Sequence, residues 1–445
     1  MEMAHSVHVC HRWRHIVFGS PRRLDLRLLC THGTPVRKNL GCLPAFPIVI
    51  HYCRGIPNDV DNIIAALEHP DRIHHLDLKL LGSQLRKVVA VMQVPFPALT
   101  HLSLESEDKN APVLPDEFLG GSAPFIQEIT LKGVIFPALP TLLSSSGYLL
   151  ILELHEIPLD GYISPEVMVA CLAALPILHS LIIRFQSPAS RPDQIHLPPA
   201  TRTVVPSLMC FEFKGASEYL EDLVARIDCP ELAEVQITYS NQLVDLQAAQ
   251  LFKFIDRPED SEMFHFRHAE VIFTRCWVTF QMYESPELVG DEDWGPVRTT
   301  MLCQGIDWQV SHISQVLTQP IAILSHVAHL KLVVHFEAEE HCQLEGIEDA
   351  EWLDLLRQFS AVQSLHVSPE LAGNIALALE DITEEIVAGV LPALDLLCLE
   401  DRPVSSVEKF LAVRRLSGRP VTLVDTEEEF DERVDTEEEF ERVES

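Results

Sequence analysis

The segment Pro97-Ala98-Leu99-Thr100-His101-Leu102-Ser103-Leu104-Glu105 decides the fold, because its P-x-L-x-x-L-x-L pattern recurs along most of the chain. A proline at the start of such a pattern ends the preceding helix and favours an extended backbone. The alternation of leucine with polar residues is typical of a strand that buries one face. The pattern therefore predicts a helix end followed by a short strand, repeated many times.

The apolar triplet of this pattern occurs in eleven copies, each with apolar residues at the first, fourth and sixth positions. The copies start at Ile73, Leu99, Ile126, Leu149, Leu178, Leu208, Leu232, Phe266, Val327, Val362 and Leu394. Between them lie segments with apolar residues at helical spacing, such as the one that follows Ser164 and Pro165. No such unit can bury its apolar face alone, so the units must stack. We therefore predict an α/β fold, a leucine-rich-repeat-like solenoid with a curved parallel sheet inside and helices outside.

The second, fourth and sixth residues after each first apolar residue are predicted to face the open concave side of the sheet. Of these 33 positions, 26 are polar or charged in a chain that is 47% hydrophobic. This bias predicts a hydrated inner wall that could bind a partner protein. The candidate partner-binding residues are His75, Asp77, Lys79, His101, Ser103, Glu105, Glu128, Thr130 and Lys132.

The pattern also suggests how the chain is divided. The irregular solenoid is predicted to span residues 29–423, with a β-hairpin or meander inserted near 261–308, where β-forming residues replace the repeat. This insertion is either a binding protrusion or a structural patch in the sheet. Residues 424–445 contain two copies of V-D-T-E-E-E-F and twelve acidic residues, so we predict a disordered acidic tail.

Composition restricts the class of protein. The formal net charge of −33 disfavours nucleic acid and anionic membranes as partners, since both are negatively charged. The eleven cysteines are scattered without a C-x-x-C pair, which indicates reduced thiols. With no apolar run long enough to span a bilayer, the expected location is cytoplasmic, nuclear or both.

No catalytic motif stands out. The chain lacks G-x-S-x-G, G-x-x-x-x-G-K-(S/T), G-x-G-x-x-G and H-E-x-x-H sequences. Its 21 histidines are spread over different copies of the repeat, and none has the spacing of a zinc site. We therefore expect no enzymatic activity, no cofactor and no metal.

The start of the chain carries a second signal. The stretch Val9-Cys10-His11-Arg12-Trp13-Arg14-His15-Ile16-Val17 and the following S-P-R-R-L-D-L-R-L resemble the second half of an F-box, here within residues 1–28. The L-P-x-E helix that opens an F-box is not among the eight residues before Val9. Together with the irregular leucine repeats, this stretch resembles the F-box families of mushroom-forming fungi.

The resemblance implies a function. Members of these families use the F-box to bind a Skp-type adaptor and its cullin complex, and the repeats to hold a target protein. Val9, Trp13, Ile16 and Val17 would then contact the adaptor, and the chain would be the substrate-recognition component of a Skp–cullin–F-box ubiquitin ligase. The alternative is a leucine-rich-repeat scaffold with no ligase role, in which these residues only cap the solenoid.

Overall fold

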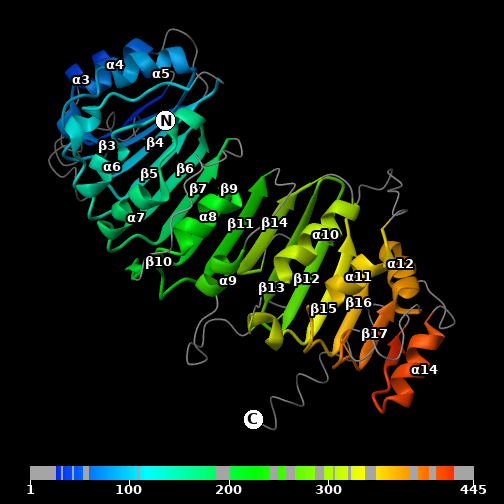
Figure 1. Ribbon diagram of the computed structural model, residues 1–445. Helices are drawn as coiled ribbons and strands as arrows, with labels where there is room; N and C mark the ends of the chain where they lie inside the picture. The colour runs from blue at the N-terminus through cyan, green and yellow to red at the C-terminus, as the bar shows by residue number, and fades with distance from the viewer. Residues whose placement is uncertain are drawn as a thin grey trace, which may run out of the picture. The chain divides into compact units, whose positions relative to one another are not determined.

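The computed structural model describes residues 27–31, 34–42, 45–53, 60–108, 111–186, 201–240, 248–255, 266–285, 295–303, 306–318, 322–335, 347–380, 389–399 and 407–424. In these residues sixteen strands form a large, mostly parallel sheet, and a further pair of strands forms a small one (Figure 1). The predicted α/β class with a large parallel sheet is confirmed. The chain divides into two compact units, one formed by 1–189, 199–212 and 226–232, and one by the rest.

Unit 1 contains strands that pair in chain order and run parallel, from β1 to β7. The strands are β1 (Leu28–Cys30), β2 (Ile48–Cys53), β3 (Ile73–Leu80), β4 (His101–Ser106), β5 (Glu128–Lys132), β6 (Ile151–Ile157), β7 (Ser180–Phe185) and, up to the unit boundary, β9 (Cys210–Gly215). The small parallel pair is β8 (Thr203–Val204) and β10 (Ile227–Asp228). The α-helices are α3 (Val36–Cys42), α4 (Val60–Leu67), α5 (Gly82–Val89), α6 (Leu139–Ser144) and α7 (Pro165–Ala173).

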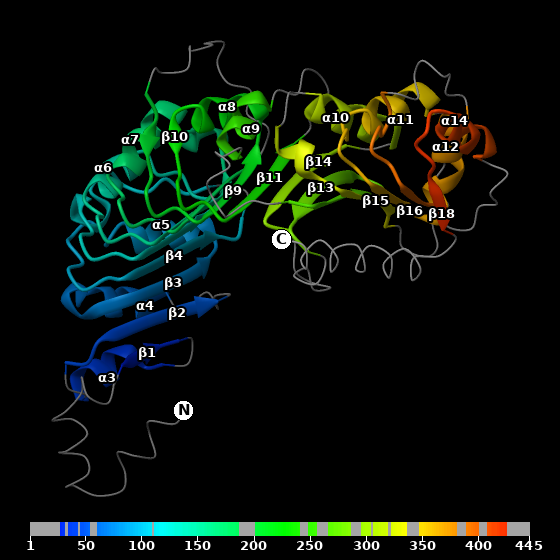
Figure 2. The same cartoon turned by 90° about the horizontal axis from the view of Figure 1, so that it is seen from below.

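The repeat explains this unit residue by residue. In the copy that contains β4, Leu99, Leu102 and Leu104 are at most 1% exposed, whereas the residues between them alternate to the other face. Backbone hydrogen bonds then continue the ladder, for instance from Thr100 N to His74 O. Helices α3, α4 and α5 contact one another in series, as do α6 and α7, and the helices cover one face of the strands (Figure 2). The leucines are therefore buried between the two layers.

Two helices differ in how their N-termini are capped. Ser164 caps α7, because its side-chain oxygen accepts a hydrogen bond from Val167 N and Pro165 occupies the first turn, as predicted. Ser217 is the first residue of helix α8 (Ser217–Val224). The N-cap residue is Ala216, which makes no side-chain hydrogen bond because it has no polar side chain.

Unit 2 contains the strands β11 (Glu234–Ser240), β12 (His268–Phe273), β13 (Trp277–Tyr283), β14 (Val297–Leu302), β15 (His329–Val334), β16 (Ser364–Val367), β17 (Leu396–Leu399) and β18 (Thr422–Val424). The α-helices are α8 (Ser217–Val224), α9 (Ala249–Ile255), α10 (Ile306–Leu317), α11 (Asp349–Leu356), α12 (Pro369–Glu380) and α14 (Glu408–Leu416). Helices α10, α11, α12 and α14 contact one another in series. Trp352 of α11 is fully buried, with its ring edge-on to Phe273 of β12.

The region where the repeat pattern fails forms an antiparallel meander within the sheet of unit 2. Strand β12 pairs antiparallel with β13, and β13 pairs antiparallel with β14. The strand order is β11-β14-β13-β12-β15, with β14 parallel to β11 and β12 parallel to β15. The three strands of the meander therefore lie between β11 and β15 in the sheet, and each outer strand is parallel to its neighbour outside the meander.

Candidate functional site

The nine residues predicted to bind a partner lie on three adjacent strands of unit 1. Their side chains are half-buried and alternate with the fully buried leucines of β3, β4 and β5. The pairing register aligns them in three rows across the strands, since His75 pairs with His101, Asp77 with Ser103 and Lys79 with Glu105. The rows continue to β5 and then to β6. We use the name polar face for a set of twelve residues on β3, β4, β5 and β6: His75, Asp77, Lys79, His101, Ser103, Glu105, Glu128, Thr130, Lys132, Glu153, His155 and Glu156.

One row of the polar face is a ladder of alternating charges. Lys79 Nζ lies 2.7 Å from Glu105 Oε1, and Lys132 Nζ lies 3.0 Å from the same oxygen. Lys132 Nζ also lies 3.5 Å from Glu156 Oε1. Each side chain comes from a different strand, so the ladder crosses β3, β4, β5 and β6. Cross-strand pairs of opposite charge stabilise a sheet and fix the positions of its side chains.

The pKa values of this row follow from its pairing. Burial alone would raise the pKa of Glu105, but hydrogen bonds from Lys79 and Lys132 outweigh it and lower the pKa below its ordinary value. The hydrogen bond to Glu105 likewise raises the pKa of Lys132, against the opposing effect of desolvation. Glu105 and Lys132 are therefore both held in their charged forms around neutral pH.

The other two rows combine histidines with carboxylates. His51 Nδ1 of β2 lies 2.7 Å from Asp77 Oδ2, and His101 Nε2 lies 3.7 Å from Glu128 Oε2. The rings of His75 and His101 are 5.2 Å apart. Burial, followed by the neighbouring His101, lowers the pKa of His75 in spite of the carboxylates nearby.

A backbone irregularity extends the polar face on β6. The register between β6 and β7 shifts between Leu154 and Ile157, and Glu156 has a φ of +49°, which is rare for a residue other than glycine. His155 and Glu156 therefore both carry polar contacts, although they are consecutive. His155 Nε2 lies 3.0 Å from Glu153 Oε2, which also accepts a hydrogen bond from Thr130 Oγ1 at 3.3 Å.

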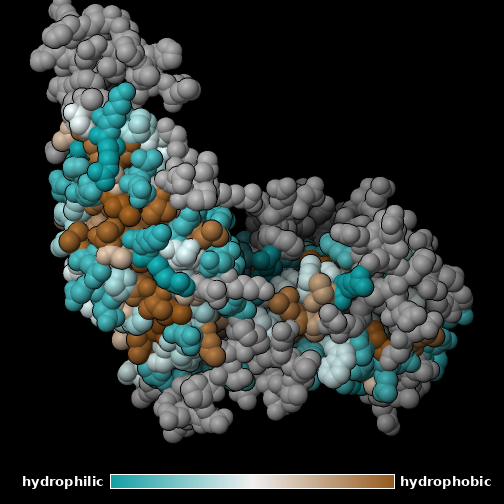
Figure 3. Space-filling model, turned by 90° about the horizontal axis from the view of Figure 1, so that it is seen from above, coloured by the Kyte–Doolittle hydropathy of each residue, from teal (hydrophilic) through white to brown (hydrophobic). Residues whose placement is uncertain are grey.

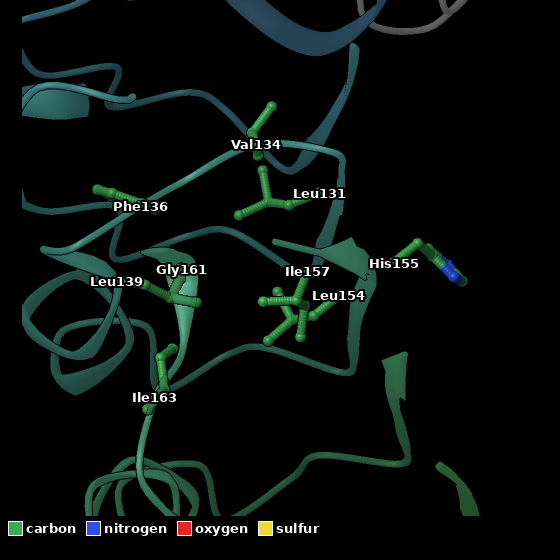
Figure 4. Close-up of a pocket in the computed structure, with 9 residues that line it drawn as sticks. All are labelled: Leu131, Val134, Phe136, Leu139, Leu154, His155, Ile157, Gly161 and Ile163. Carbon is green, nitrogen blue, oxygen red and sulfur yellow. The ribbon is translucent and has the colours of Figure 1, made fainter. Parts of the chain in front are cut away.

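The opposite side of the same strand ends is apolar. Leu131, Leu154 and Ile157 help to line a small pocket, together with Val134, Phe136, Leu139, Gly161 and Ile163. Figure 4 shows the side chain of His155 directed away from these apolar residues, although His155 borders the same pocket. At the bulge, the apolar pocket and the charged ladder therefore lie on opposite sides of β6.

A further ion pair continues the charged surface within unit 1. Arg184 of β7 donates two hydrogen bonds to the carboxylate of Glu212 on β9, at 2.5 and 2.7 Å. Two parallel bonds of this kind give a more defined geometry than a single lysine contact. The polar pattern therefore continues beyond β6.

Several of the corresponding strand positions in unit 2 are buried. His329, Ser364 and His366 were predicted to face an open inner wall, but they are 5%, 1% and 2% exposed. His329 Nδ1 lies 2.6 Å from Ser364 Oγ, and the His329 ring stacks on that of His268 with a centroid distance of 4.5 Å. The prediction of a wet wall along the whole repeat is therefore wrong for these strands. Polar side chains that satisfy one another can be buried in a sheet, and alternation alone does not reveal this.

Metal-ligand clusters and cysteine thiols are two further kinds of site to consider. Among the described residues, no group of three or more histidine, cysteine or acidic side chains could hold a metal ion. Burial raises the pKa of Cys30, Cys171 and Cys303 to about 11, so these thiols stay protonated and are poor nucleophiles. In the same part of the chain, no helix has the length and apolar character needed to cross a membrane.

The nine predicted residues cover β3, β4 and β5, but they do not include Glu153, His155 and Glu156 of β6 or His51 of β2. Glu156 lies outside the alternating positions, and only the bulge gives it a place beside Lys132. His51 belongs to a strand without the leucine triplet. The predicted adaptor-binding residues Val9, Trp13, Ile16 and Val17 lie outside the described residues.

Comparison with known proteins assigns no family to this chain. No protein-family model matches the chain, and a search of curated proteins found no significant match.

Proposed function

We propose that this protein is a leucine-rich-repeat-like solenoid that recognises a target protein and acts as the substrate-recognition component of a Skp–cullin–F-box ubiquitin ligase. The observation that carries the proposal is the polar face, on which charged and hydroxyl side chains of four parallel strands lie in register. In such an assembly the chain makes no bonds itself. It holds the target near the enzymes that transfer ubiquitin, which raises the local concentration of the target.

Exposed apolar surface on unit 1 also supports a role in protein recognition. Leu81, Val113 and Leu159 lie in segments that follow strands of unit 1, and their exposed fractions are 44%, 55% and 70%. Figure 3 shows brown apolar patches between teal polar ones on unit 1. Protein interfaces combine a few apolar anchors with surrounding polar contacts, so this mixture suits a protein partner.

The ligase role rests on the resemblance of residues 9–28 to the second half of an F-box. Val9, Trp13, Ile16 and Val17 would share one side of a helix and contact the Skp-type adaptor. The alternative is a binding scaffold without a ligase role, in which the same apolar residues cover the end of the repeat array.

Co-purification with a Skp-type adaptor distinguishes the two functions. The full chain should form a complex with the adaptor, and Trp13→Ala should weaken that complex at least tenfold without changing the unfolding transition. Trp308→Ala is the matched control, since Trp308 is a half-exposed tryptophan of α10 in unit 2. Absence of any adaptor complex removes the ligase role, and global unfolding of Trp13→Ala supports the scaffold with a capping helix.

A further inference from the structure

We propose that the polar face binds an extended, basic protein segment that runs across strands β3–β6 and carries two lysine or arginine side chains four residues apart. This inference rests on the proposed function, because it names the chemistry of the target that the polar face would recruit.

The positive charges of the polar face are already engaged. Lys79 and Lys132 both contact Glu105, at 2.7 and 3.0 Å, and Lys132 also contacts Glu156. Glu105 lies between the two lysines and contacts both, so its carboxylate is already paired with permanent positive charges. An acidic partner would have to break these pairs before it could bind either lysine, which disfavours an acidic segment.

The carboxylates outside the charged ladder pair with histidines and not with lysines. The ion-pair partners of Asp77, Glu128 and Glu153 among the described residues are histidines, at 2.7, 3.7 and 3.0 Å. Lysine and arginine are fully charged at neutral pH, and their charge-assisted hydrogen bonds to carboxylates are strong. A basic side chain of a partner can therefore pair with these carboxylates. The three carboxylates are 26%, 40% and 28% exposed, so a partner can reach them.

The spacing of the carboxylates sets the spacing of the charges on the partner. Asp77, Ser103, Thr130 and Glu153 pair in register across four strands. Neighbouring strands are about 4.8 Å apart, so the carboxylates at the two ends of this row are about 14 Å apart. An extended chain advances about 3.4 Å per residue and places residues four apart on the same face, also about 14 Å from each other. Two basic residues at positions i and i+4 would therefore match both ends.

The middle of the row suits a polypeptide backbone. Ser103 and Thr130 lie between the two carboxylates. The Ser103 hydroxyl can donate and accept hydrogen bonds, and the Thr130 hydroxyl, which donates to Glu153, can still accept one. The formal net charge of −33 on the chain adds a long-range attraction for a basic segment. Charge, spacing and hydrogen-bonding capacity thus favour the same occupant.

A labelled peptide tests this inference on the full chain. The probe is a twelve-residue glycine–serine peptide with two arginines at positions i and i+4, and its binding is measured by fluorescence anisotropy at low and high salt. We expect binding that weakens at high salt, and an affinity at least tenfold lower for the Asp77→Asn/Glu153→Gln double variant. The Asp71→Asn/Glu117→Gln double variant removes the same charge from exposed sites outside the polar face and should bind within twofold of the wild type.

The spacing is tested separately with peptides that carry the two arginines at i and i+1, or two glutamates at i and i+4. Both should bind at least fivefold more weakly than the first probe. Equal binding by all three peptides, or by both double variants, overturns the inference. Adaptor co-purification of the Asp77→Asn/Glu153→Gln variant is measured in parallel. If that complex persists while peptide binding fails in the wild type, only the inference about the basic segment falls.

Discussion

Acid should destabilise unit 2 through His329, the buried histidine of β15. Its pKa is lowered to about 3 by burial and then by His268 and Arg267, whereas a histidine in an unfolded chain has its ordinary value near 6.5. The unfolded state therefore binds a proton below about pH 6.5, and the folded state does not. The stability contributed by the neutral ring is complete above pH 6.5 and falls as the pH drops towards 3.

The magnitude follows from this difference. Each pH unit in this window costs about 1.4 kcal/mol, so lowering the pH from 7 to 4.5 should remove about 3 kcal/mol of unfolding free energy. His329→Asn removes the titration but keeps a hydrogen-bonding group near Ser364. The variant loses packing at every pH, yet its stability should depend on pH more weakly than that of the wild type.

Urea unfolding between pH 7 and 4.5, followed by tryptophan fluorescence, measures the effect. Trp352 is fully buried in unit 2 and reports on its unfolding. The exposed His326, replaced by asparagine, serves as the control and should leave the pH dependence unchanged. Parallel stability curves for the wild type and His329→Asn would refute the reasoning.

Three further changes test other parts of the structure. Arg414→Met should destabilise unit 2 by about 2 kcal/mol, because the buried guanidinium donates to backbone carbonyls, whereas the exposed Arg415→Met should have little effect in the same urea assay. Gly120→Ala should lower the free energy of unfolding by about 2 kcal/mol or more, because φ is +67° and the new Cβ would lie 2.8 Å from a proline. Gly147→Ala, which has open space around the new Cβ, should lower the thermal unfolding temperature much less. Glu105→Gln should weaken unit 1 by about 1 kcal/mol at low salt and by less at high salt, and salt-independent destabilisation would contradict an electrostatic role.

The leucine triplets were sufficient to predict where most strands lie and which face of each is buried. This worked because a period of two ties every apolar residue of a short strand to one side, as Leu102 and Leu104 of β4 illustrate. The rows of the polar face followed from the same rule. The charges on neighbouring copies then showed only that pairing was possible, and the register determined that Glu105 lies between two lysines.

Other features had no signal in the sequence. The bulge at Glu156 depends on an unusual φ that the local residues do not announce. The alternation of β-forming residues predicted a meander, but the strand order β14-β13-β12 depends on pairings between distant segments. The burial of His329 and Ser364 depends on their hydrogen bond, so polarity alone gave the wrong expectation.

The antiparallel meander of unit 2 has a consequence for how this chain can grow. Strands β14, β13 and β12 run in alternating directions, and both outer strands match the parallel strands beside them. Relative to a single repeat strand, the meander adds two strands, and an even addition preserves chain polarity. A segment that added one strand through a hairpin would reverse every later strand and move the following loops to the opposite edge. An insertion joined by hairpins must therefore add an even number of strands if the later strands are to keep their direction.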